Sequence, residues 1–226
     1  MTDFVNAITK PFSDMKSLGI GIVLGAIPIV NMLTINGFGL NCAKHAEKKT
    51  LPKWENIVDH ITKSIMGAIA SFVYLLPAII VGAIFMATIL MSVLTSATSG
   101  VTDPMALINS VLTGGIIGVI LFVILALLAV FLIPLALTRY VLKDKFGEAF
   151  AFGKIIKRAL TGEYIITWIV YIIYAIVLSV ILSIISGILM MVPAIGFILG
   201  MLISGLGTYL IAVSGYTMFG QIKWKD

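Results

Sequence analysis

Five long stretches of this sequence contain no Asp, Glu, Lys, Arg or His, and they restrict the fold more than any other feature of the chain. They are residues 18–42, 64–94, 111–137, 164–190 and 193–219. A helix needs about 20 mostly apolar residues to cross the hydrocarbon core of a membrane, and every stretch exceeds that length. The sequence therefore predicts an all-α integral membrane protein, a bundle of about five transmembrane helices in a single membrane domain.

The composition agrees with lipid as the main solvent. Hydrophobic residues make up 60% of the chain and charged residues 11%, whereas a soluble domain is roughly half apolar and a quarter charged. The mean hydropathy is +1.15, and a water-soluble fold with this excess would expose large apolar patches and aggregate. The single cysteine, Cys42, excludes an internal disulfide bond and a metal site built from several cysteines.

The positions of Lys and Arg predict the orientation of the chain. With five spans, 13 of the 15 basic residues fall on one side, in the segments that follow the first, third and fifth spans. The positive-inside rule makes that side cytoplasmic. We therefore expect a multi-pass protein of the cell membrane, with its C-terminus in the cytoplasm and its N-terminus outside. Because topology accounts for the net charge of +5, nucleic acid is not an expected partner.

The first stretch, residues 18–42, leaves a second topology open. Pro28 and Asn31 could break it into a re-entrant hairpin whose halves are each too short to span. All 15 basic residues would then lie on one side of the membrane. We expect a true span here, with the re-entrant hairpin as the alternative.

Two amphipathic segments precede pairs of spans. Residues 54–65 (WENIVDHITKSI) and 146–160 (FGEAFAFGKIIKRAL) both place apolar residues at helical spacing, with charged residues opposite. We expect two helices lying in the cytoplasmic interface, with Trp54 as an interfacial anchor. The alternative is that each segment is the solvated start of the following span. The two segments with their hairpins form a weak parallel repeat, an arrangement that transporters often contain.

Polar groups at membrane depth are few. No acid or base other than tyrosine and Cys42 occurs within the spans, which argues against a proton-driven pump. Asn31 and Asn36 are the polar intramembrane candidates. We expect both to hydrogen-bond to neighbouring helices, and the alternative makes them ligands at an unwound point of a transporter helix. Glycine pairs four residues apart, such as Gly21 and Gly25, predict close helix packing.

The two histidines do not form a recognisable catalytic or metal motif. His45 and Glu47 point to different faces of a helix, as do Asp59 and His60, and the spacing HExxH is absent. We expect no catalytic residue, no metal and no cofactor. A lipid-modifying enzyme that uses Asp59, His60 or Glu148 at the cytoplasmic surface remains an alternative.

The basic segments have a simpler physical use. A Lys or Arg near an anionic leaflet contributes about 1 kcal/mol of attraction. We therefore expect contacts with anionic lipid headgroups, with a membrane-protein partner or with a second copy of the chain. The residues expected to make them are Lys48, Lys49, Lys53, Lys154, Lys157 and Arg158.

Several phrases of the sequence resemble a known family. They are PFSDMKSLGIG at residues 11–21, GAIPIVNMLTINGFGL at 25–40, LPKWENIVDHITKSI at 51–65 and SGYTMFGQ at 214–221. The chain resembles the prokaryotic, largely archaeal, membrane proteins grouped as domain of unknown function 4013. The resemblance implies an integral membrane protein of an archaeon, and it brings no substrate, cofactor or catalytic residue.

Three functions are compatible with the sequence. The first, which we favour, is a non-enzymatic accessory or scaffold component that docks through its basic cytoplasmic face. The second is a small permease or channel-like protein for a neutral or apolar solute, and the third is a lipid-modifying enzyme. A polar cavity near Asn31 and Asn36 would favour the second, and a pocket that joins Asp59, His60 and Glu148 would favour the third.

Overall fold

The computed structural model describes residues 2–99, 105, 116–192 and 195–224, and these residues contain helices and no strand. The chain divides into two compact units. Unit 1 contains Met1–Ala70 and Pro134–Asp226, and unit 2 contains Ser71–Ile133. Each unit is described by itself below.

Four helices of the described residues are long and apolar enough to cross a membrane, which confirms the predicted all-α membrane fold. These helices are α4 (Ile57–Ser99), α6 (Ile116–Lys143), α8 (Gly162–Leu189) and α9 (Ile195–Gly220). Residues 111–115 of the predicted third span and 193–194 of the predicted fifth lie outside the described residues.

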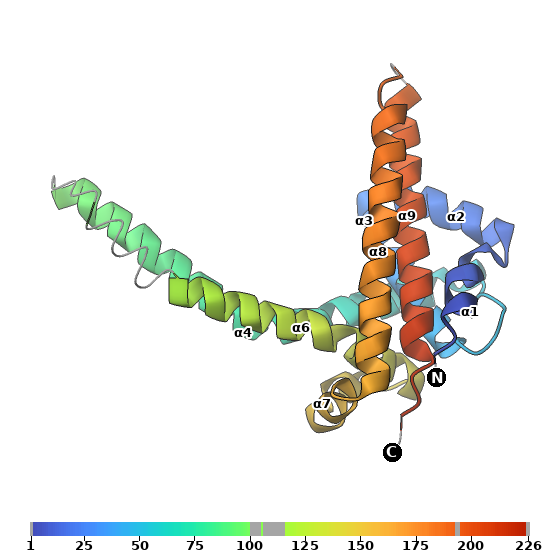
Figure 1. Ribbon diagram of the computed structural model, residues 1–226, viewed down its shortest axis with the longest axis horizontal. Coiled ribbons are helices and arrows are strands. Elements are labelled where there is room, and N and C mark those ends of the chain that lie inside the picture. Colours follow the sequence, from blue (N-terminus) through green and yellow to red (C-terminus); the bar gives the residue numbers. More distant parts are fainter. Residues whose placement is uncertain (1, 100–104, 106–115, 193–194, 225–226) are drawn as a thin grey trace. The chain divides into compact units, whose positions relative to one another are not determined.

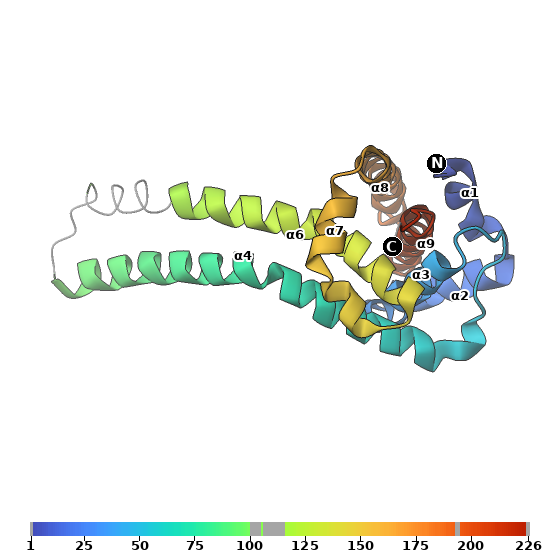
Figure 2. The ribbon, with the colours of Figure 1, turned by 90° about the horizontal axis from the view of Figure 1, so that it is seen from below.

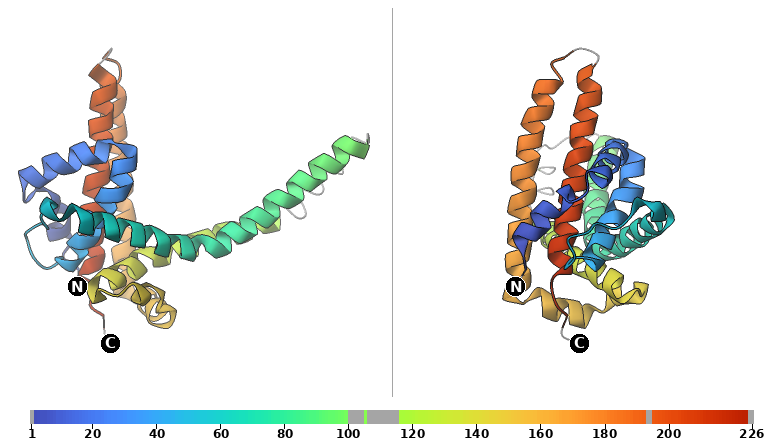
Figure 3. Two further views of the ribbon diagram at one scale, coloured as in Figure 1. Left: turned by 180° about the vertical axis from the view of Figure 1, so that it is seen from behind. Right: turned by 90° about the vertical axis from the view of Figure 1, so that its right-hand side faces the viewer.

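Helix α9 forms the centre of unit 1. It packs against α8 on one side and against α2 (Met15–Ala26) and α3 (Pro28–Lys44) on the other. Figure 1 shows α8 and α9 as a pair of adjacent helices, and Figure 3 shows the pair from behind and from the side. The core lies between α3 and α9 and contains Ile35, Phe38, Cys42, Tyr209, Leu210, Ala212 and Val213.

The first apolar stretch forms two helices and not one continuous helix, so our expectation of a span over residues 18–42 stays a prediction. Ile27 has an extended backbone (φ −98°, ψ 112°), and Pro28 begins the next helix. Proline has no N–H to continue a helix, and its ring disfavours the α conformation at the preceding residue. The resulting helices of 12 and 17 residues are each at or below the shortest length that crosses the hydrocarbon core, roughly 17 residues.

The N-terminal segment lies at the same end of unit 1 as the end of α9. The segment contains α1 (Phe4–Thr9) and the short helix η1 (Lys10–Phe12). The Asp3 N–H donates to the Gln221 side chain at 2.5 Å, and the Asn6 amide donates to the Ala46 carbonyl at 3.5 Å. Residues before α2 and after α3 therefore meet at one end, as the N and C labels in Figure 1 also indicate. This arrangement agrees with the re-entrant alternative, and the side of the membrane on which the N-terminus lies stays a prediction.

The two amphipathic segments differ in structure. Over residues 54–65, a short helix η2 (Trp54–Asn56) leads directly into α4, so the expected separate helix is absent and the segment is the charged start of a long helix. Over 146–160, helices η4 (Phe146–Phe150) and α7 (Phe152–Ala159) precede α8 as separate elements. Their position at a membrane interface stays a prediction.

Helix α7 has two apolar faces. Ile155 and Ala159 are buried in unit 1, whereas Phe152, Ile156 and Leu160 are 46–73% exposed at intervals of four residues. An exposed apolar stripe on a short helix that also carries Lys154 and Lys157 is typical of a helix lying in the headgroup region.

Unit 2 is a hairpin of the apolar parts of α4 and α6, which lie side by side in Figure 2. Small residues allow the close contact, because a Cβ at Gly82 would lie 3.1 Å from the Phe122 ring and one at Gly118 would lie 3.0 Å from the Phe85 ring. A cavity of about 400 Å³ between the helices has a mostly apolar lining.

Candidate functional site

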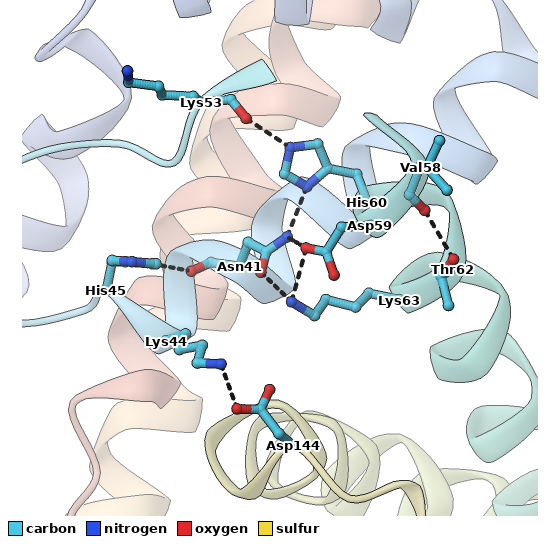
Figure 4. Close-up of polar contacts among 10 residues, drawn as sticks. All are labelled: Asn41, Lys44, His45, Lys53, Val58, Asp59, His60, Thr62, Lys63 and Asp144. Carbon is cyan, nitrogen blue, oxygen red and sulfur yellow. Dashed lines mark hydrogen bonds and ion pairs between the residues drawn. The ribbon is translucent and has the colours of Figure 1, made fainter. Parts of the chain in front are cut away.

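A closed polar network joins the end of α3 to the start of α4 (Figure 4). The Asn41 side-chain amide donates to Asp59 Oδ2 at 2.8 Å and to His60 Nδ1 at 2.7 Å. Its carbonyl oxygen accepts from Lys63 Nζ at 2.5 Å, and Lys63 also pairs with Asp59 at 2.9 Å. Both hydrogens and the oxygen of the Asn41 amide are therefore used, which is the arrangement that a buried amide requires.

Both ring nitrogens of His60 form hydrogen bonds, and two aromatic rings contact its imidazole. Its side chain is 1% exposed, and Nε2 lies 3.2 Å from the Lys53 carbonyl, which can only accept. The ring meets Phe38 and Trp54 edge-on, with centroids 5.2 and 5.5 Å apart. We assign the proton to Nε2, so that Nδ1 accepts from Asn41. Burial lowers the pKa of His60, which keeps the ring neutral.

Asp59 stays charged beside this neutral ring. Partial burial by itself would raise the pKa of the carboxyl, but the hydrogen bonds from Lys63 and Asn41 outweigh it, and the pKa lies below its usual value. Asp59 and His60 therefore lie in one cluster. The alternative of a lipid-modifying enzyme required this pair to meet, together with Glu148. Glu148 does not join them, because it forms an ion pair with Arg139, whose Nε lies 2.8 Å from Oε2.

Local sequence explains why α3 and α4 approach so closely here. A Cβ at Gly37 would lie 1.7 Å from the His60 carbonyl oxygen, so only glycine fits at this position. Phe38 stacks on Trp54 with ring centroids 4.1 Å apart and planes 8° from parallel. The Trp54 indole N–H donates to the Ser17 carbonyl at 3.3 Å. Trp54, which we expected to anchor the chain in the membrane interface, is therefore half-buried inside unit 1.

The loop of residues 45–53, called here the lysine loop, is held at both ends. Lys10 is 2% exposed, and its Nζ donates to the His45 carbonyl at 2.6 Å. Burial lowers the pKa of this lysine. At the other end, His60 donates to the Lys53 carbonyl. The side chains of Lys48, Lys49 and Lys53 are exposed, and in the part of the chain that the structure describes none of them forms an ion pair.

A cavity of about 530 Å³ lies between the lysine loop and the Asn41 network. This volume is within the usual range for small-molecule sites, about 300–1,000 Å³. Four lysines and one aspartate contribute to its lining, so the cavity is cationic. Its lining residues are Asn41, Lys44, His45, Lys48, Thr50, Leu51, Pro52, Lys53, Asn56, Asp59, His60 and Lys63.

The predicted basic segments meet at the end of unit 1 where α3 and α9 end and α8 begins, called here the charged end. Lys44, the last residue of α3, pairs with Asp144, which joins the end of α3 to the segment after α6. Arg139, in the last turns of α6, lies over the Trp224 ring at 4.6 Å, which joins the end of α6 to the C-terminal residues. The sequence-predicted grouping of these segments on one side is therefore reproduced within unit 1, and the cytoplasmic assignment of that side stays a prediction.

The remaining candidates on α7 have different environments. Lys154 and Lys157 are exposed, whereas Arg158 is mostly buried and pairs with Glu163 at the start of α8. Arg158 therefore connects α7 to α8, and only the two lysines project from the helix as we expected of contacts with lipid or a partner.

Asn31 and Asn36 do not form a joint site. The Asn31 amide donates to the Gly25 carbonyl at 3.0 Å, across the break between α2 and α3, and Asn36 is exposed. A different cavity, of about 480 Å³, lies between α8 and α9 and has a mixed polar and apolar lining. Five hydroxyl groups contribute to it, from Ser179, Ser183, Ser186, Ser204 and Thr208. The sequence signal for it is the helical spacing of the serines in α8, which we did not single out.

Among the described residues no group of three His, Cys, Asp or Glu side chains could hold a metal ion.

Comparison with known proteins places the chain in a family. Residues 20–187 match the model of a family described as "Protein of unknown function (DUF4013)". The chain belongs to the DUF4013 family. The DUF4013 match includes the Asn41 network and the lysine loop, and it confirms the resemblance seen in the sequence. No curated protein and no solved structure matched the chain.

Proposed function

We propose that this DUF4013 protein is a non-catalytic component of the cell membrane that binds anionic lipids through its charged end. The observation that carries the proposal is the contrast between two sets of side chains. The acid–base candidates Asp59 and His60 are bonded within the Asn41 network. Lys48 and Lys53, in contrast, border the same cavity and are exposed, and neither forms an ion pair in the described part of the chain.

The hydrogen bonds of His60 favour a structural role for this residue over a catalytic one. A general base must accept a proton from its substrate. Nδ1 of His60 already accepts from Asn41, and Nε2 donates to Lys53. Proton uptake would break the bond to Asn41 and place a second positive charge beside Lys63, so this ring serves to hold the loop rather than to exchange protons.

The charged end carries the features that attract an anionic bilayer. Exposed lysines on the lysine loop and on α7 each contribute about 1 kcal/mol near an anionic leaflet. The exposed apolar stripe of Phe152, Ile156 and Leu160 supports a position of α7 at the level of the headgroups. Attraction and apolar contact together favour lipid over a soluble partner.

Thermal unfolding in detergent tests the proposal, because Cys42 is the single cysteine and is fully buried. A thiol-reactive dye therefore reports the loss of native packing around α3. We expect added anionic lipid to raise the unfolding midpoint more than zwitterionic lipid, since a ligand that binds only the folded state stabilises it. The difference should shrink between about 50 mM and 500 mM salt, as charge screening increases. Equal midpoints with both lipids at low salt would contradict the proposal.

A small permease for a neutral solute is the second candidate, and the cavity between α8 and α9 supports it. Its five hydroxyl groups offer hydrogen bonds between two apolar helices. Uptake of small neutral solutes by proteoliposomes distinguishes the candidates. Uptake that Ser183→Leu abolishes would favour transport, because leucine would fill the cavity.

A further inference from the structure

We infer that the cavity behind the lysine loop is a specific site for the phosphate of one anionic lipid headgroup, with Lys48 and Lys53 as its principal contacts. The inference rests on the proposed function and deepens it. It replaces general attraction to an anionic surface by a single site with named ligands.

The charges around the cavity leave room for one anion. Lys44 and Lys63 pair with Asp144 and Asp59, respectively. Lys48 and Lys53 have no acidic partner in the described part of the chain. Two unpaired ammonium groups match the negative charge of a lipid phosphate. Thr50 and Asn56, which also border the cavity, add neutral hydrogen-bond donors.

The loop that carries these lysines is already ordered by buried groups. Lys10 and His60 are 2% and 1% exposed, and they donate to the carbonyls of His45 and Lys53 at the two ends of the loop. Between them, the Lys48 N–H donates to the His45 carbonyl at 3.0 Å. A ligand therefore binds a preformed loop and does not have to order it, which favours affinity.

The surroundings favour a lipid over a soluble phosphate. Leu51 and Pro52 contribute apolar surface to the cavity. The loop continues through η2 into α4, whose first residues Ile57 and Val58 are 40% and 72% exposed. Exposed apolar side chains at the start of a membrane-spanning helix give the acyl chains of a bound lipid an adjacent apolar surface.

Native mass spectrometry of the full chain in detergent tests the site with three probes: phosphatidic acid, phosphatidylglycerol and phosphatidylcholine. The double variant Lys48→Gln/Lys53→Gln is compared with Lys154→Gln/Lys157→Gln, which removes the same charge from α7. We expect the loop variant to weaken binding of the first anionic lipid by about 10- to 30-fold, as two lost lysine contacts imply. We expect the α7 variant to weaken it by several-fold less, because Lys154 and Lys157 do not line the cavity. Unchanged protection of Cys42 from a thiol reagent shows that both variants are folded.

Each other outcome identifies which proposal fails. Equal weakening by both variants, or by neither, overturns the specific site and leaves general binding to anionic lipid in place. Competition by inorganic phosphate at concentrations equal to those of the lipid overturns the lipid as the source of the phosphate. A wild-type protein that binds phosphatidylcholine as tightly as the anionic lipids overturns the proposed function together with the site.

Discussion

Asn41 is the residue that links the most groups in unit 1. Its one amide satisfies a carboxylate, a neutral imidazole and an ammonium group that come from little more than one turn at the start of the neighbouring helix. A buried network of this kind is stable only when each member is bonded, because an unpaired buried polar group costs about 1–3 kcal/mol. The lysine loop depends on the same network, since His60 holds one of its ends.

His60 makes the stability of the protein depend on pH. Burial lowers its pKa in the folded state below the ordinary value of 6.5, so the unfolded chain binds more protons than the folded one. Stability is therefore complete above pH 6.5 and falls as the pH decreases below it, by at most about 1.4 kcal/mol per pH unit. We expect the unfolding free energy, followed by the reactivity of Cys42, to decrease between pH 7 and pH 5. The variant His60→Gln should lose this dependence, and an equal slope in the variant would contradict the assignment.

The two groups closest to His60 do not reverse this sign. Asp59 favours the protonated ring and Lys63 disfavours it, and burial is the largest influence on its pKa. Asp59 contributes in a separate range, because its own pKa is also lowered in the folded state. The stability that it supplies is lost only as the pH falls below its ordinary value of 3.8.

At the scale of elements, glycine decides how closely α3 approaches its neighbours. Gly37 faces the backbone of His60 in α4, and Gly39 faces Tyr216 and the backbone of Ala212 in α9. Without a driving force from water, helices in lipid associate through close packing of this kind. The contact at Gly37 also brings Asn41, one turn further along α3, within reach of the charged start of α4.

Gly37→Ala tests this contact. The added Cβ would lie 1.7 Å from a backbone oxygen, so α3 and α4 must separate. We expect a loss of about 1–3 kcal/mol of unfolding free energy, together with faster labelling of Cys42. Gly19→Ala in α2 is the control, because a Cβ there meets no atom within 4 Å. Alanine in a helix is favoured over glycine by about 0.5–1 kcal/mol, so the control should be neutral or stabilising. Equal effects of the two substitutions would refute the close contact.

At the scale of the whole molecule, the contacts of the N-terminal segment agree with a topology other than the one that we expected. Thr2 bonds to Thr167 near the start of α8, and Asp3 bonds to Gln221 after α9. With four helices able to span the membrane, an even number of crossings agrees with both termini on one side. All 15 basic residues of the chain would then lie on the cytoplasmic side, as the positive-inside rule favours.

Cysteine labelling from each side of the membrane tests this topology in a Cys42→Ala background. Val5 and Lys223 lie at the charged end and are 74% and 82% exposed. Met191, between α8 and α9, is 82% exposed and serves as the opposite reference. We expect a membrane-impermeant maleimide to label Val5→Cys and Lys223→Cys from the cytoplasm, and Met191→Cys from outside. Labelling of Val5→Cys together with Met191→Cys would restore the crossing that the sequence suggested.

The fold class could be read from the sequence because hydropathy acts on each residue independently of its neighbours in space. Uncharged stretches such as 164–190 must lie in lipid wherever they are placed, and α8 lies over nearly the same residues. Pro28 marked the break between α2 and α3, but a proline within an apolar stretch is compatible with both a kinked span and a hairpin. The contacts of residues 2–6 with the ends of other helices favour the hairpin, and these contacts have no signal in the sequence.

The sequence by itself determined that this protein is a helical membrane protein with its charges gathered in a few segments, since a charged side chain is costly in hydrocarbon. It also singled out Asp59, His60 and the lysines of the loop, whereas Asn41 and Lys63 were recognised as members of the candidate site only in the structure. Only the tertiary structure decided which of them are bonded to one another and which remain available to a ligand. That distinction depends on distances between residues far apart in the chain, and local patterns do not encode those distances.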